Sequence, residues 1–148
     1  MRVMIDTCII VDGIHGREPF CQDASDIFTL AGVGKFDGFA TAKSLADIYY
    51  LTHKALHSKE KTRKVISNLL KILYIVDTTA IDCQNALISE TSDFEDAIMI
   101  ETAQREEMDC IVTRNTIDYK RSRIPIYTPK EFLSLMGVLS RDTQEGVL

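Results

Sequence analysis

Short apolar runs alternate along this chain with longer segments whose apolar residues recur at helical spacing. Strands that alternate with helices favour a parallel sheet, because each crossover between parallel strands needs a helix-sized connection. We therefore predict an α/β fold of three layers, with helices on both faces of a roughly five-stranded parallel sheet. The predicted strands are 2–6, 39–41, 74–76, 109–112 and 125–127; the predicted helices are 24–30, 44–56, 59–73, 79–89, 92–108 and 129–136.

Several local assignments depend on single residues. The apolar Cys8 to Val11 run is interpreted as a packed continuation of the first strand. Ser44 is predicted to open a helix, with Asp47 as its capping-box partner, and Ser92 is predicted to cap the helix 92–108, with Glu95 as its partner. Gly137 is expected to end the domain, which leaves one domain at 1–137 and a polar tail at 138–148.

The composition fits a cytoplasmic globular domain. A hydrophobic content of 45% over 148 residues is enough for one buried core. No apolar stretch approaches the roughly 18 residues of a membrane span, and Asp6 and Asp12 interrupt any secretory segment at the start, so we expect no membrane partner. The four cysteines form no C-x-x-C pair, and the His53/His57 pair lacks the glutamate of a zinc-protease motif.

Four separated stretches each place an aspartate where a strand or helix begins or ends: Asp6, Asp47, Asp96 and Asp118. In parallel sheets, sites form outside the carboxyl ends of the strands, which makes a shared pocket plausible. Carboxylates brought together cannot all stay ionised unless a cation compensates them. Taken singly, however, each also fits a turn, a helix N-terminus or a loop.

The chain resembles the PIN-domain family, over about residues 2–135. The resemblance rests on Val3-Met-Ile-Asp6-Thr7, Ser44-x-x-Asp47, Asp93-Phe-Glu-Asp96-Ala97, Val112-Thr-Arg-Asn115 with Asp118-Tyr119, and Ile124-Pro-x-x-Thr-Pro129, in this order. It implies a parallel sheet flanked by helices and a ribonuclease site that uses Mg²⁺ or Mn²⁺. Many members are toxins of toxin–antitoxin modules.

Carried over by position, the resemblance makes Asp6, Asp96 and Asp118 metal ligands. Asp47 stands where the family usually has glutamate and is expected to act through water. Thr7, Ser44, Asp93, Thr113 and Asn115 are expected to line the site. Arg114, Lys120, Arg121 and Arg123 border it, and they either position RNA phosphates or belong to a solvated loop.

These expectations describe a metal-dependent endoribonuclease with RNA as substrate, and the resemblance adds an antitoxin partner and a homodimer. A net charge of −5 argues weakly against indiscriminate nucleic-acid binding, but metal in the pocket would offset part of it. The alternative is a PIN-fold binding module of weak or lost catalysis, which the aspartate at position 47 keeps open. A phosphatase with Asp6 as nucleophile is disfavoured, because such chemistry wants a second aspartate where Cys8 stands.

Overall fold

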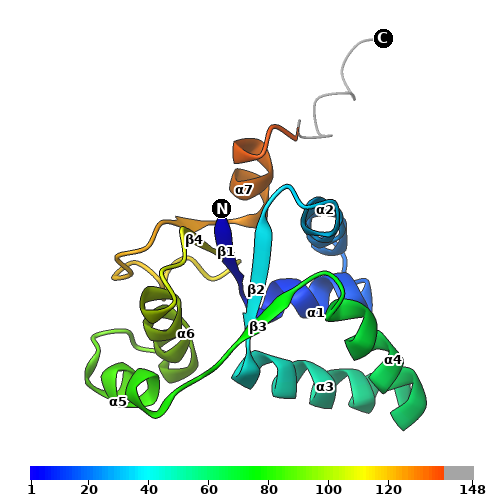
Figure 1. Ribbon diagram of the computed structural model, residues 1–148, viewed down its shortest axis with the longest axis horizontal. Coiled ribbons are helices and arrows are strands. Elements are labelled where there is room, and N and C mark those ends of the chain that lie inside the picture. Colours follow the sequence, from blue (N-terminus) through cyan, green and yellow to red (C-terminus); the bar gives the residue numbers. More distant parts are fainter. Residues whose placement is uncertain (139–148) are drawn as a thin grey trace.

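The computed structural model of the protein describes residues 1–138 and shows a parallel sheet of five strands between two layers of helices (Figure 1). The spatial order of the strands is β3-β2-β1-β4-β5, and every neighbouring pair is parallel. The predicted α/β fold with a five-stranded parallel sheet is therefore confirmed. The strands are β1 (Arg2–Ile5), β2 (Asp37–Thr41), β3 (Tyr74–Val76), β4 (Cys110–Val112) and β5 (Ile126–Tyr127).

Both faces of the sheet are buried, as a parallel sheet requires. In β1, Val3 and Ile5 belong to one apolar core and Met4 to the other. The first core is completed by α1 (Thr7–His15), α2 (Cys21–Gly32), α3 (Ala42–Leu56), α4 (Lys59–Leu69) and α7 (Pro129–Leu135). The opposite face is covered by α6 (Phe94–Arg105), on which α5 (Ala80–Ile88) packs.

The Cys8 to Val11 run does not continue the first strand, so that prediction was wrong. Helix α1 begins at Thr7, and the backbone N–H of Ile10 donates to the carbonyl of Asp6 at 3.3 Å. The run is apolar on every side because α1 lies between the sheet and other helices, which bury Ile9, Ile10 and Val11. A short apolar run that is buried all round does not distinguish a strand from a helix.

Two helix starts also differ from the prediction. The N-cap of α3 is Thr41, whose hydroxyl accepts from the backbone N–H of Ser44, so Ser44 is already in the first turn. The N-cap of α6 is Asp93 rather than Ser92, and its carboxylate accepts from the backbone N–H of Asp96 at 3.0 Å. In both cases a second residue of capping type lay within one turn of the predicted one.

Helix α4 is shorter than predicted. It ends at Leu69 rather than at residue 73, and Leu70 beyond it is exposed. Val138, assigned to the polar tail, packs against the core, and the rest of that predicted tail, 139–148, lies outside the described residues. Within residues 1–138, none of the helices is both long and apolar enough to cross a membrane.

The order of the strands creates a crevice at the carboxyl end of the sheet. From β1 the chain continues to β2 on one side, whereas β4 lies on the other side of β1. The connections therefore leave in opposite directions between β1 and β4, which is where open α/β sheets bind ligands. Ile5 pairs with Val112, so the residues that follow, Asp6 and Thr113, emerge next to one another.

Candidate active site

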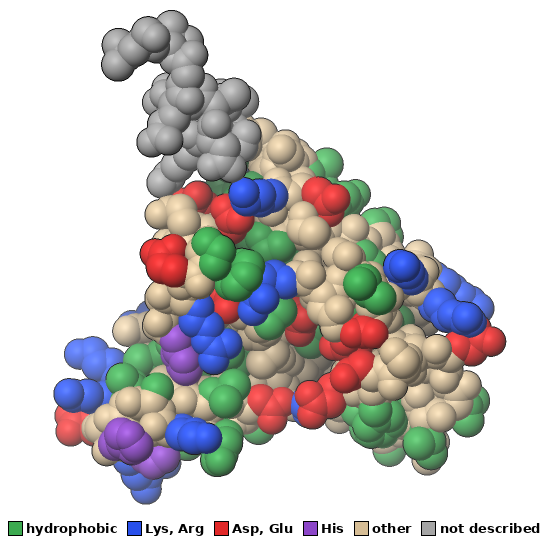
Figure 2. All heavy atoms as spheres, turned by 180° about the vertical axis from the view of Figure 1, so that it is seen from behind, with side chains coloured by type: hydrophobic (Ala, Val, Ile, Leu, Met, Phe, Trp, Pro, Cys, Tyr) green, Lys and Arg blue, Asp and Glu red, His purple; other side chains and the backbone are tan. Residues whose placement is uncertain are grey.

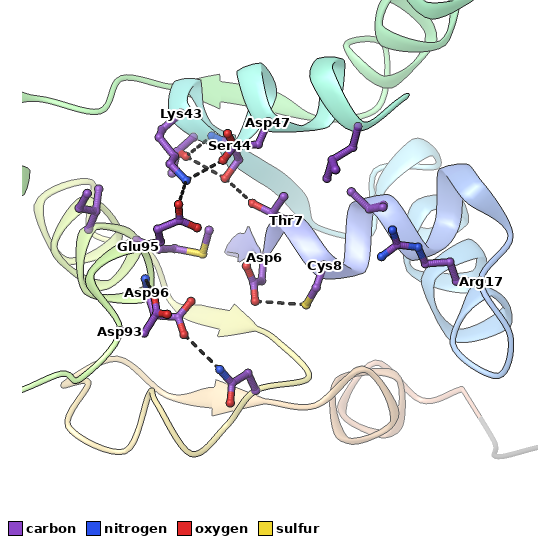
Figure 3. A pocket seen from close by; sticks show the side chains of 16 residues that line it. Asp6, Thr7, Cys8, Arg17, Lys43, Ser44, Asp47, Asp93, Glu95 and Asp96 are labelled. Carbon is purple, nitrogen blue, oxygen red and sulfur yellow. Dashed lines mark hydrogen bonds and ion pairs between the residues drawn. The ribbon is translucent and has the colours of Figure 1, made fainter. Parts of the chain in front are cut away.

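A pocket of about 360 Å³ opens at the carboxyl end of the sheet, between the starts of α1, α3 and α6 (Figure 3). It brings together predicted residues from segments far apart in the sequence. Those that line it are Asp6, Thr7, Ser44, Asp47, Asp93, Asp96 and Asn115. Asp118 and Thr113 stand behind this lining and reach it through hydrogen bonds.

Asp6 lies at the base of the pocket and is only 8% exposed. It occupies the N-cap position of α1, but its carboxylate caps no backbone N–H there. One oxygen, Oδ2, instead accepts from the hydroxyl of Thr113 at 2.7 Å and from the thiol of Cys8 at 3.2 Å. Two neutral donors thus hold the carboxylate in place without supplying a compensating positive charge.

Asp96 faces the same pocket from the first turn of α6. Burial raises its pKa to about 6, and the carboxylates of Asp6, Asp93 and Asp118 act in the same direction, against a smaller lowering by a hydrogen bond from Tyr119. The phenol of Tyr119 donates to Oδ1 of Asp96 at 3.1 Å. Close carboxylates that lack a cation produce a shift of this kind.

Asn115 connects the carboxylates of Asp96 and Asp118. Its amide nitrogen donates to Oδ2 of Asp96 at 3.2 Å and also contacts a carboxylate oxygen of Asp118. The hydroxyl of Ser92 donates to the other oxygen of Asp118 at 3.2 Å. Asp118 therefore stands outside the pocket lining and is tied to Asp96 by one shared amide.

Hydroxyl groups form the wall opposite the acidic group. Ser44 is 1% exposed, and its Oγ accepts from Thr7 at 2.8 Å and from Thr41 at 2.9 Å. Because Thr41 also caps α3, the hydrogen bonds that start the helix fix these hydroxyls. These three hydroxyls are polar groups of fixed orientation that carry no charge.

Asp47 does not join the other carboxylates. Its Oδ2 lies 2.6 Å from Nζ of Lys43, and the same ammonium lies 3.0 Å from Oε1 of Glu95 (Figure 3). Burial acts to lower the pKa of Lys43, but its hydrogen bonds to the two carboxylates outweigh this and raise it. The structure thus places Asp47 in the pocket lining but binds it to a lysine.

The predicted basic residues differ in their surroundings. The guanidinium of Arg114 contacts the fully buried Asp12 through Nε at 2.7 Å, and stacks over Phe20. Arg121 pairs with Glu90. Lys120 and Arg123 are exposed on the loop between β4 and β5. Figure 2 shows basic side chains toward both edges of one face of the molecule, with a group of acidic side chains in its lower middle.

Several polar residues of the site were missed from the sequence. Lys43 and Arg17 line the pocket as its cations, Cys8 contacts Asp6, and Glu95 pairs with Lys43. Tyr119, outside the lining, donates a hydrogen bond to Asp96. Burial and the nearby Asp6 raise the pKa of Cys8 to about 12. The spacing of Lys43 and Asp47, four residues apart on one helix, is the one local signal that predicts such a contact.

The donor set suits a hard divalent cation, although it is not a closed cage. Within residues 1–138, no three His, Cys, Asp or Glu side chains stand close enough together to hold a metal ion. Mg²⁺ needs only one or two direct carboxylates and keeps several waters. Asp96 has a raised pKa beside Asp6, and a cation would stabilise such a pair of carboxylates. These residues therefore fit a divalent metal ion.

Comparison with known proteins decides the family. The sequence profile described as the PIN domain matches residues 2–117, more than half of the chain. The chain belongs to the PIN-domain family. No curated protein matches it closely enough to count as a relative.

Solved structures share the fold of this PIN domain. The VapBC2 complex from Rickettsia felis, bound to promoter DNA, superposes with a TM-score of 0.66 at 21% identity, covering 86% of this chain and 98% of that one. A toxin–antitoxin complex from Klebsiella pneumoniae gives 0.63 at 21%, covering 86% and 97%. VapC20 from Mycobacterium tuberculosis, a toxin that cleaves the sarcin–ricin loop, gives 0.59 at 12%, covering 74% and 86%. At these identities the similarity establishes the fold alone.

Proposed function

We propose that this PIN domain is an endoribonuclease that depends on Mg²⁺ or Mn²⁺. The observation that carries the proposal is the meeting of Asp6 and Asp96 in one pocket, where burial and crowding raise the pKa of Asp96 to about 6. A pocket that makes its own carboxylates costly to ionise gains stability when a divalent cation binds. RNA as the substrate is inferred from the family and from VapC20, a solved neighbour that cleaves the sarcin–ricin loop.

Each side chain has a proposed role. Asp6, oriented by Thr113, and Asp96, oriented by Tyr119, would hold the cation, with Asp118 as a further carboxylate that Asn115 ties to Asp96. When bound, the cation makes water a better nucleophile and offsets charge on the phosphate.

The remaining residues are proposed to orient the nucleophile and the RNA. The hydroxyls of Thr7 and Ser44 orient water, Asp47 acts through water, and Asp93 fixes the start of α6. Among the predicted phosphate contacts, Lys120 and Arg123 fit best, because Arg114 and Arg121 already pair with carboxylates.

We also propose that the protein is the toxin of a toxin–antitoxin pair. Support comes from fold neighbours solved as complexes of this type, among them VapBC2 and the complex from Klebsiella pneumoniae. An antitoxin protein is then a partner, a homodimer is the expected assembly, and the cytoplasm is the place where both the RNA and the antitoxin are met.

A second candidate function is a PIN-fold binding module without catalysis. Two observations favour it: no three ligand side chains stand close together in the part of the chain that the structure describes, and Asp47 is engaged by Lys43. A module of this kind would bind RNA or protein at the same pocket and would need no cation.

Calorimetric titration with Mn²⁺ tests the choice, with the wild type, Asp96→Asn and Asp37→Asn compared. Asp37 is exposed at the opposite end of β2, so its replacement removes one charge without touching the pocket. Binding by the wild type and Asp37→Asn that is lost in Asp96→Asn supports the nuclease, and cleavage of a mixed RNA pool then follows the same order. Absence of binding in all three favours the binding module.

A further inference from the structure

Lys43 bridges two walls of the pocket. It is the second residue of α3, and its ammonium lies 2.6 Å from Asp47 on the same helix and 3.0 Å from Glu95 on α6. Figure 3 shows its side chain extending from α3 toward Glu95, in the same pocket as Asp6 and Asp96. A cation is therefore placed in the pocket that also holds the acidic pair.

The contacts of Lys43 are poor structural supports. The side chains of Lys43, Asp47 and Glu95 are 33%, 43% and 73% exposed, and ion pairs at such exposure contribute little net stability. Neither carboxylate has another hydrogen bond among those found within residues 1–138. The ammonium can therefore leave both partners at small cost when a stronger anion arrives.

Lys43 is one of few positive charges in an acidic pocket. Five acidic residues line it, against two basic ones, Arg17 and Lys43. In Figure 3, Arg17 lies at the far end of the pocket from Lys43. Lys43 is thus the cation on the side where Asp47 and Glu95 would otherwise repel a phosphodiester.

We propose that Lys43 is a phosphate-binding residue of this nuclease, held in reserve by Asp47 and Glu95 until single-stranded RNA enters the pocket. Its ammonium then exchanges the two carboxylates for the non-bridging oxygens of a phosphate. Asp47 is freed in the same step to face the acidic pair. The inference rests on the proposed function and adds a substrate contact to it.

Two affinities that move in opposite directions test the proposal. Removal of the positive charge in Lys43→Gln leaves the acidic pocket less compensated, so Mn²⁺ should bind about three- to tenfold more tightly. The same variant should bind a fluorescent oligouridine about three- to tenfold more weakly, as read by anisotropy on RNA shown to be intact. A merely structural role would weaken both or change neither.

Two further variants serve as controls. Lys43→Arg keeps the charge and should restore RNA binding close to that of the wild type. Lys54→Gln removes an exposed lysine from the same helix, outside the pocket lining, and should leave both affinities unchanged. Thermal unfolding of each variant confirms that the fold is kept.

The outcomes separate this inference from the proposed function. Opposite shifts in Lys43→Gln, with rescue by arginine, support the role of Lys43. A wild type that binds both probes, with Lys43→Gln unchanged or weakened for both, overturns the role of Lys43 and leaves the nuclease proposal standing. A wild type that binds neither probe overturns both.

Discussion

Replacement of Asp96 by asparagine should make the metal-free protein more stable near neutral pH. The pKa of Asp96 rises from its ordinary value of 3.8 to about 6 in the folded state, because of burial first and of Asp6 next. The folded protein therefore binds this proton more tightly than the unfolded chain, and its free energy of unfolding falls as the pH rises from about 4 to about 6. Above that window the folded wild type carries the full cost of the ionised side chain.

The size of the gain follows from the same values. A difference of this size corresponds to about 3 kcal/mol if solvent screens nothing. Asp96 is only partly buried, and screening reduces the expected gain to about 1–2 kcal/mol. Asparagine can keep both contacts of the side chain: its oxygen accepts from Asn115, and its amide donates to the phenol oxygen of Tyr119. The phenol hydrogen of Tyr119 can then be donated to the sulfur of Met99.

Urea unfolding with a chelator present provides the measurement, at about pH 7 and again near pH 4. The stability difference between Asp96→Asn and the wild type should be present at the higher pH and vanish at the lower one, and Asp37→Asn should show neither effect. In a second series without chelator, added Mn²⁺ should stabilise the wild type and leave the stability of Asp96→Asn unchanged. Two results would refute the inference that burial and nearby carboxylates make Asp96 costly to ionise. One is a variant no more stable than the wild type near pH 7, and the other is a gain in stability that persists near pH 4.

Three further outcomes follow from the packing. Arg114→Leu leaves the fully buried Asp12 without its cation and should lower the free energy of unfolding by about 3–5 kcal/mol in urea titrations; a loss below about 1 kcal/mol would contradict that burial. Gly38→Ala places a methyl group 2.6 Å from a carbon of Leu73 and should cost about 1–3 kcal/mol by the same assay, whereas a neutral result would mean that Leu73 moves freely. The thiol of Cys8, with its pKa raised to about 12, should resist alkylation near pH 8 in the native protein and react after unfolding, as mass spectrometry of its peptide reports.

Much of the fold could be predicted from local sequence. Most of the strands are short apolar runs, and their alternation with helices favours a parallel sheet. The family resemblance selected the same acidic residues that the fold places at the carboxyl edge. The predicted roles of Asp6, Asp96 and Asp118 themselves stay predictions until metal binding is measured.

Boundaries were predicted less well where two local solutions were close in free energy. Thr41 and Ser44 are both good N-cap residues, as are Ser92 and Asp93. The choice within each pair depends on which side chain makes a hydrogen bond to another part of the fold instead. Ser92, released from capping, bonds Asp118 instead. Periodicity likewise could not distinguish a buried helix from a strand at Cys8 to Val11.

The sequence by itself determined the class of fold and the aspartates that the strand and helix ends deliver, because both follow from interactions within one element or its neighbour. The tertiary structure alone decided which charges meet. Arg114 is held by Asp12, about a hundred residues earlier, and Lys43 is shared between α3 and α6. Such contacts depend on how elements pack rather than on spacing along the chain, and in this protein they separate the carboxylates free to bind a cation from those already paired.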